Sequence, residues 1–468
     1  MDADGKKFST NTDADGRFHS KWLNMMYPRL YLARNLLRED GVIFISIDDH
    51  ELDNLRKVCN EVFGEENFIG LVVWRARNFA DARPMRGLSV DHEYIAVYGK
   101  SLDGRMTGKQ RDEGKYSNPD NDARGPWTSC SLLGKATREQ RPNLHYNVVH
   151  PQTGEVFPAP PETGWICRPE TFRRKIEEGR ILWPKKPGGR PREKVFLLEL
   201  QSGVLGFPSV LDGVFTSDGT QEMRELFSDQ VFQFPKPSLL IRDLLTQGMD
   251  ADGVVLDFFA GSGPTAHAVL ELNKQDGGNR KFILVQLPEP TGRDDYPTIA
   301  DITKERVRRV IRKLNDEDAG RLDLDGAGEQ DRGFRVFKLA ESNFKPWNAE
   351  VPHDAEALER QLELHVEHIR EDRTADDILC EILLKSGFPL TTPVETLTLA
   401  GKTVYSVSGG ALFICLEREL TLEVIRAMAE RKPERVVCLD EGFAGNDQLK
   451  ANAVQLFKTR GVTSFKTV

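Results

Sequence analysis

Val255-Leu-Asp-Phe-Phe-Ala-Gly-Ser-Gly-Pro-Thr-Ala-His-Ala268 is the stretch that decides the fold of this chain. Its apolar start is typical of a strand that is covered on both faces, and an aspartate ends the strand. Gly261 and Gly263 let the backbone approach a ligand where a side chain would clash. Pro264 suits the first turn of a helix, because the amide hydrogen that proline lacks would have no partner there. A nucleotide-like ligand can rest against such a helix start, although an isolated Gly-x-Gly also serves turn geometry alone.

Composition limits the class of protein. The chain has 468 residues, a formal net charge of −9 and a hydrophobic fraction of 39%, which predicts a globular protein of about two to four domains. No stretch approaches the ~20 consecutive apolar residues of a membrane span, and the first residues lack a secretory signal. We therefore expect a cytoplasmic protein without a membrane partner. Six cysteines occur singly, so reduced, mostly buried thiols are expected, and neither a disulfide framework nor a metal site is predicted.

The first hundred residues alternate between helix and strand patterns. Residues 1–17 are polar and resemble a surface loop, whereas helical spacing of apolar residues follows over 21–37 and 52–62. Residues 42–47 are apolar throughout, which fits a central parallel strand. Two shorter strands are expected at 71–74 and 94–98. The alternation predicts an open α/β sheet.

The pattern changes after residue 100 into a Gly-, Pro- and Trp-rich region, so we interpret 101–230 as an inserted domain. Helical periodicity resumes at 234–245, just before the glycine turn. A buried strand is predicted at 281–287 and a helix at 301–314, followed by an acidic linker or long loop at 315–333. The last region is expected to contain helices at 355–369 and 376–384, strands at 403–407 and 412–415, and a closing α/β unit.

The insert contains a locally basic stretch. Residues 168–194 carry ten Lys or Arg against four Glu, a local charge of +6 in an acidic chain. Any single one of these side chains can equally lie on an ordinary solvated face.

Taken together, these segments resemble the modification (Mod) subunit of type III restriction-modification systems, a DNA adenine methyltransferase of the beta class. The matching segments, in order, are 18–30, 40–49, 63–68, 92–98, 118–122, 125–127, 234–237, 256–265 and 279–289. The resemblance implies a permuted, doubly wound Rossmann-like methyltransferase sheet with a target-recognition insert. Because the basic stretch falls in this insert, its Lys and Arg side chains could contact phosphates or read base edges of DNA. The implied DNA-binding residues are Arg173, Arg174, Lys175, Lys185, Lys186, Arg190 and Arg192. The implied domains are a partial N-terminal half (1–100), the insert (101–230), a cofactor-binding half (231–314) and a small C-terminal α/β domain (334–468).

The same resemblance implies a site for S-adenosylmethionine. Phe259 would lie against the adenine, and the glycines would lie near the amino-acid end. An acidic residue after the second strand usually pairs with the ribose hydroxyls, but Gln286 stands there, with Glu289 three residues later. The implied cofactor-binding residues are Lys236, Pro237, Ser238, Asp257, Phe259, Gly261, Gly263, Gln286 and Glu289.

One expected motif is absent from the sequence. The family holds the flipped adenine in an Asp-Pro-Pro-Tyr segment that precedes the part matching 18–30, and no Asp or Asn followed by Pro-Pro and an aromatic residue occurs here. No catalytic residue is therefore predicted. We expect a chain that lacks the family's N-terminal part, from a late-assigned start or an interrupted gene. A natural DNA-binding fragment is the alternative, but losing a central strand would leave unpaired sheet edges.

Three functional hypotheses follow. The first is methylation of adenine in a short asymmetric DNA site with S-adenosylmethionine, double-stranded DNA as substrate and a helicase-endonuclease (Res) partner. The second is a catalytically inactive DNA-binding specificity fragment. The third, a nicotinamide-dependent oxidoreductase, is disfavoured because no third glycine precedes the helix. The charged helices of the last region fit homodimerisation, contact with Res, or plain solvated faces.

Overall fold

The computed structural model describes residues 18–80, 87–200, 203–319, 330–345, 369–443 and 445–468. Backbone contacts divide the chain into two compact units, Met1–Gly333 and Phe334–Val468, and each is described by itself. The loop expected at 1–17 and nearly all of the helix expected at 355–369 lie outside the described residues. The functional division into four domains stays a prediction.

The first unit contains a four-stranded sheet with the order β1-β3-β2-β11. Strand β3 (His92–Gly99) runs antiparallel to both β1 (Val42–Ile47) and β2 (Phe68–Arg75), and β11 (Val210–Leu211) runs parallel to β2. The expectation of a central parallel strand at 42–47 was therefore wrong. Among the described residues, β1 has β3 as its one neighbour and lies at the edge of the sheet.

Helices on both faces of this sheet explain the apolar pattern of β1. Its residues Ile43, Ile45 and Ile47 pack with α1 (Phe18–Leu36) and α2 (Leu52–Phe63). Val42 and Phe44 instead pack with α5 (Ser238–Gly248) on the opposite face. An apolar run thus reports helices on both faces and not the direction of the neighbouring strands. The α/β class is as predicted.

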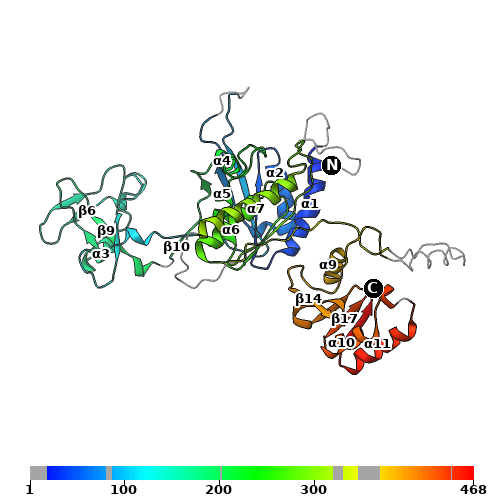
Figure 1. Ribbon diagram of the computed structural model, residues 1–468. Coiled ribbons are helices and arrows are strands. Elements are labelled where there is room, and N and C mark those ends of the chain that lie inside the picture. Colours follow the sequence, from blue (N-terminus) through cyan, green and yellow to red (C-terminus); the bar gives the residue numbers. More distant parts are fainter. Residues whose placement is uncertain (1–17, 81–86, 201–202, 320–329, 346–368, 444) are drawn as a thin grey trace. The chain divides into compact units, whose positions relative to one another are not determined.

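The glycine turn belongs to a second pair of strands. Strand β12 (Val254–Asp257) leads through the turn into α6 (Pro264–Asp276) and pairs in parallel with β13 (Lys281–Leu284), which is shorter than the strand predicted at 281–287. Helix α7 (Ile299–Asp318) follows and extends into the predicted linker. Helices α5, α6 and α7 lie side by side (Figure 1), and α4 (Thr216–Phe227) packs on α7.

Helix α5 connects the two groups of strands. Leu240 and Leu244 pack against the β1 sheet, whereas Ile241 and Leu245 pack with Val255 of β12. Strands β1 and β12 are not paired with each other, and each has one strand neighbour among the described residues. The predicted single sheet therefore appears as two pieces that share a helix.

The chain enters the insert through β4 (Lys109–Gln110) and leaves it through β10 (Val204–Leu205), and these strands pair antiparallel. Within it, β9 (Arg192–Phe196) lies between β5 (Trp127–Ser131) and β8 (Ile181–Leu182). A short hairpin of β6 (Asn147–Val149) and β7 (Val156–Pro158) and the helix α3 (Pro169–Glu177) complete it. Its small core includes Leu132, Val148, Phe157, Trp165 and Phe172.

The second unit is a five-stranded sheet with helices on both faces. Its order follows the chain: β14 (Val394–Leu399), β15 (Lys402–Val407), β16 (Leu412–Cys415), β17 (Arg435–Cys438) and β18 (Ser464–Thr467). The first three strands are antiparallel and the last three are parallel. One core contains α9 (Ala375–Lys385), and the other contains α10 (Leu422–Glu430) and α11 (Asp447–Thr459). The predicted helix at 376–384 and strand pair are confirmed.

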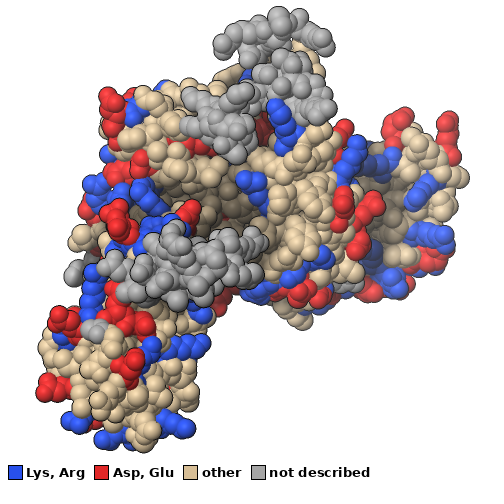
Figure 2. Space-filling model, turned by 90° about the vertical axis from the view of Figure 1, so that its right-hand side faces the viewer, with Lys and Arg blue, Asp and Glu red and all other residues tan. Residues whose placement is uncertain are grey.

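The cysteines, the helices and the surface charges each bear on what the composition led us to expect. All six cysteines are unpaired, and Cys59, Cys415 and Cys438 are buried. In the part of the chain that the structure describes, no helix is long and apolar enough to cross a membrane. Figure 2 shows one face of the molecule, where basic and acidic side chains are interspersed.

Candidate functional site: a cofactor turn and a basic insert

The turn between β12 and α6 contains two glycines in the left-handed region of backbone conformation. Gly261 and Gly263 have φ values of 53° and 80°, which side-chain-bearing residues adopt only at a cost. A Cβ on Gly263 would lie 3.0 Å from Cγ2 of Thr303 in α7. Pro264 occupies the first turn of α6, as predicted. The structure thus contains the strand, the glycine turn and the helix start that the sequence indicated.

A side chain at the end of β12 and another just after β13 hold this turn. The Asp257 carboxylate accepts hydrogen bonds from the Phe259 amide at 3.1 Å and from the Thr265 hydroxyl at 2.6 Å. The Gln286 side-chain oxygen accepts from the Gly261 amide at 2.8 Å. Gln286, two residues after the end of β13, therefore supports the turn, a role that the sequence did not indicate.

Two candidate residues remain open to a ligand. The Phe259 side chain is 52% exposed, and its ring contacts Phe258 at a centroid distance of 5.2 Å. Glu289 is exposed, and its carboxylate makes no hydrogen bond or ion pair with another described residue. Its backbone is fixed, because its carbonyl accepts from the Ile299 amide at 2.9 Å. Phe259 offers an aromatic face, and Glu289 offers two acceptor oxygens.

The upstream motif forms the start of α5. Pro237 precedes the helix, and Ser238 is buried at its first position. Ser238 donates its amide and its hydroxyl to Glu222 of α4, at 3.0 to 3.1 Å and 2.9 Å. Lys236 donates to Glu93 of β3 at 2.6 Å, and its ammonium lies 5.3 Å from the ring centroid of Trp74. Lys236 is thus neutralised by a carboxylate, and the role of the three residues in cofactor binding stays a prediction.

A buried arginine of α7 lies behind the turn. Arg306 is 0% exposed and donates to Glu222 at 2.9 Å, to the Ser262 hydroxyl at 2.9 Å and to His267 at 3.2 Å. Burial lowers the pKa of Arg306 to about 10, against the opposing charge of Glu222. The sequence contained a signal for it, because this arginine falls on the apolar stripe of α7 with Ile302 and Val310.

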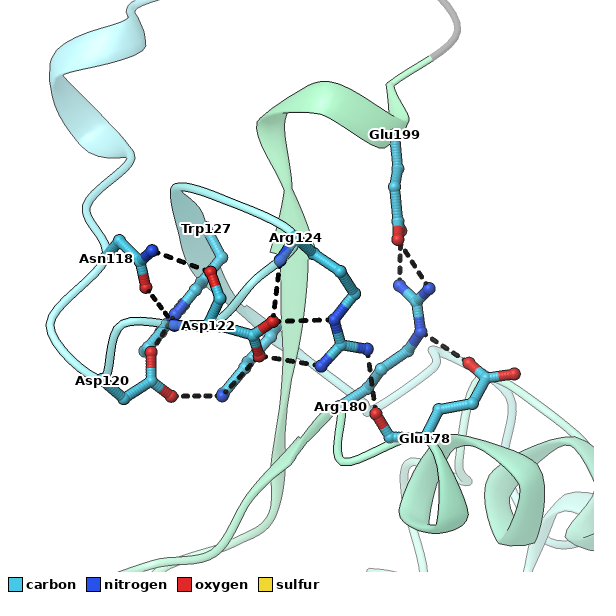
Figure 3. Close-up of polar contacts among 9 residues, drawn as sticks. Asn118, Asp120, Asp122, Arg124, Trp127, Glu178, Arg180 and Glu199 are labelled. Atoms are coloured by element: carbon cyan, nitrogen blue, oxygen red, sulfur yellow. Dashed lines mark hydrogen bonds and ion pairs between the residues drawn. The ribbon is translucent and has the colours of Figure 1, made fainter.

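Acidic side chains already neutralise part of the basic character of the insert. Figure 3 shows the Asp122 carboxylate facing Arg124, and Arg180 between Glu178 and Glu199. Arg124 donates to Asp122 at 2.8 and 2.9 Å, which holds the pKa of that carboxyl well below its usual range. Lys194 pairs with both Asp120 and Asp122. Arg124, Arg180 and Lys194 stabilise the fold of the insert through these ion pairs. They are therefore poor candidates for DNA contact.

The predicted DNA-binding residues divide into two groups. Lys175 pairs with Glu193, Arg174 lies 3.8 Å from Glu178, and Arg192 donates to Ser129 at 2.6 Å. Four exposed cations have no hydrogen-bond or ion-pair partner among the described residues: Arg173, Lys185, Lys186 and Arg190. The second group is free to contact phosphates without breaking an internal bond.

Comparison with known proteins agrees with this geometry. A family model described as DNA methylase matches residues 5–312. The chain belongs to the DNA methylase family. The EcoP15I Mod subunit of Escherichia coli, a type III restriction-modification enzyme, is 30% identical over 96% of this chain and 73% of that protein. The StyLTI Mod subunit of Salmonella typhimurium is 34% identical over 69% of this chain and 49% of that protein, so the chain spans about half of this relative.

A solved structure is also similar to the chain. The DNA modification methylase of Thermus thermophilus, in complex with S-adenosyl-L-methionine, is 15% identical over 64% of this chain and 83% of that one, with a TM-score of 0.30. By family, the present chain is an adenine-specific DNA methyltransferase related to the Mod subunits of type III restriction-modification systems, as the sequence predicted. The roles of individual residues stay predictions.

Proposed function

We propose that this chain supplies the cofactor-binding and DNA-reading parts of a type III modification methyltransferase. The observation that carries the proposal is the turn from β12 to α6, where two glycines with positive φ lead into a helix start beside the exposed ring of Phe259. The methionine end of S-adenosylmethionine would lie along Gly261 and Gly263, and Lys236, Pro237 and Ser238 would close over it. Phe259 would stack on the adenine. Bound cofactor supplies the methyl group.

Of the two candidates for the ribose, we propose Glu289. The Gln286 oxygen is already occupied by the Gly261 amide, whereas the Glu289 carboxylate is exposed and has no partner among the described residues. Two adjacent hydroxyls suit a carboxylate that can accept from both. Glu289→Gln should weaken cofactor binding about tenfold, because a charge-assisted hydrogen bond is lost. Asp294→Asn, an exposed carboxylate of the same loop, is the control and should not change binding.

We propose that methyl transfer needs an Asp-Pro-Pro-Tyr segment that the sequence does not contain. The arrangement of strands supports this proposal, because β1 and β12 each have one strand neighbour among the described residues and both pack on α5. A strand that carries this segment, supplied by another stretch of polypeptide, would pair with these edges and bring the catalytic side chains toward the turn. The purified chain should therefore bind S-adenosylmethionine and DNA without transferring the methyl group.

The experiment is a titration with S-adenosylmethionine and a transfer assay with radiolabelled cofactor on double-stranded DNA. Transfer by this chain alone would contradict the proposed need for a further segment. Failure to bind the cofactor would contradict the proposed site itself. Binding of DNA and cofactor without transfer also fits the second candidate, a specificity fragment. Addition of a polypeptide that carries the Asp-Pro-Pro-Tyr segment separates the two, because only the first candidate gains activity.

The proposed partners follow from the relatives. We propose that double-stranded DNA is bound by the insert through its exposed cations, and that a Res subunit joins the chain in the cytoplasm, where its DNA substrate lies. A homodimer formed through the second unit is a further proposal. Sedimentation velocity of the chain, alone and with Res, tests both assemblies.

A further inference from the structure

A buried polar network connects the two segments of the proposed cofactor site. Glu222 of α4 accepts from the amide and hydroxyl of Ser238 and from Arg306 of α7. Arg306 in turn donates to the hydroxyl of Ser262, which lies between the two glycines of the turn. Two side chains thus join the start of α5 to the cofactor turn, although residues 222 and 306 are 84 positions apart in the chain.

The network also includes a histidine of α6. Nδ1 of His267 lies 3.2 Å from Arg306, and Nε2 lies 3.1 Å from the Glu271 carboxylate. Arg306 thus contacts groups on α4, on the turn and on α6.

Stability alone is a weak reason for such an arrangement. Arg306 is 0% exposed, and the side chain of Glu222 is 20% exposed. Removing two charges from water is costly, and well-packed apolar residues often stabilise a fold as much as a buried ion pair does. Apolar packing does not fix the relative positions of particular atoms, whereas hydrogen bonds determine which atoms meet and at what distance.

We propose that Arg306 and Glu222 are positioning residues for the cofactor. Arg306 holds the turn through Ser262, and Glu222 holds the start of α5 through Ser238, so the pair sets the spacing between the two walls of the site. The proposal rests on the proposed function, because it requires that S-adenosylmethionine binds between these segments. Neither residue needs to touch the cofactor.

The test uses Glu222→Gln in the full chain. The single side-chain oxygen of glutamine can still accept from Ser238, but the NH2 group that replaces the other carboxylate oxygen cannot accept from Arg306, so the link is broken with little change of shape. We expect S-adenosylmethionine affinity, measured by calorimetry, to fall about tenfold. DNA affinity, which a general folding defect would also lower, should stay at the wild-type value. Glu305→Gln is the control, because Glu305 pairs with Arg309 and Arg312 on α7 and not with this network.

A second variant separates position from stability. Glu222→Gln combined with Arg306→Met replaces the ion pair by neutral groups and should recover thermal stability while cofactor binding stays weak. Ser262→Ala removes only the hydrogen bond from Arg306 to the Ser262 hydroxyl. It keeps the proposal testable if Glu222→Gln fails to fold, and it should weaken S-adenosylmethionine binding several-fold. Wild-type cofactor affinity in either the double variant or Ser262→Ala overturns the inference. A wild-type chain that does not bind the cofactor would instead contradict the proposed function.

Discussion

The backbone at Gly263 has a conformation that only glycine adopts at low cost. With φ at +80°, a Cβ would be strained and would also lie 3.0 Å from Cγ2 of Thr303. Gly263→Ala should therefore lower the free energy of unfolding by about 1–3 kcal/mol. It should also weaken cofactor binding, because the turn must move to relieve the contact. Urea unfolding and calorimetric titration measure the two effects.

Gly277 provides the matched control at the other end of α6. It has φ of +71°, and no atom lies within 4 Å of its added Cβ. Gly277→Ala should thus lower the free energy of unfolding through backbone strain alone and leave cofactor affinity unchanged. Equal cofactor affinities for Gly263→Ala and the wild type would show that the ligand does not use this turn.

At the scale of single elements, the start of α7 depends on a capping box. Thr298 accepts from the Asp301 amide, and the Asp301 carboxylate accepts from the amide and hydroxyl of Thr298. The hydrogen bond with Lys304, followed by those with Thr298, lowers the pKa of Asp301 to about 2 from 3.8. Because the folded pKa is the lower one, this contribution is present above pH 4 and disappears as the pH falls toward 2.

Asp301→Asn should therefore reduce stability by about 1 kcal/mol at pH 7, and the difference from the wild type should shrink as the pH falls below 4. Urea unfolding at several pH values between 7 and 3 checks this expectation. A difference that stays constant over that range would argue against the ionised cap. Since α7 carries Thr303 and Arg306, fraying of its start should also weaken cofactor binding slightly.

The insert gives a prediction about electrostatics. Lys185, Lys186 and Arg190 are exposed and have no partner among the described residues. Replacing all three by alanine should weaken DNA binding and reduce the slope of log K against log salt by up to about 0.9 for each phosphate contact that is lost. Fluorescence anisotropy at several salt concentrations gives both quantities.

Lys175 serves as the comparison within the same basic stretch, because it pairs with Glu193 inside the insert. Lys175→Met should lower the stability of the insert and leave the salt slope unchanged. If instead it reduces the slope as much as the triple variant does, the division of the cations into structural and free groups is wrong.

Over the whole molecule, the sequence predicted those features that neighbouring residues specify. The strand, turn and helix around Gly261 were predictable because glycine conformations and Pro264 specify them within a few residues. The Arg306–Glu222 link was not, because it joins helices that meet only through tertiary packing. The edge position of β1 was missed for a similar reason, since its apolar residues report α1, α2 and α5 and not its strand neighbours.

The whole chain also divides into parts that should fold separately. The sheet of Phe334–Val468 has a hydrophobic core on each face, and every buried residue of both cores lies within that unit. A fragment of these residues should therefore unfold cooperatively by itself, with a midpoint within a few degrees of the corresponding transition in the full chain. Circular dichroism and calorimetric melts of the fragment and the full chain test this.

Residues 1–333 alone should keep their affinity for S-adenosylmethionine, because the turn and its supports lie in that unit. The two units would depend on each other if the fragment 334–468 had no cooperative unfolding transition, or if the fragment 1–333 lost its affinity for S-adenosylmethionine.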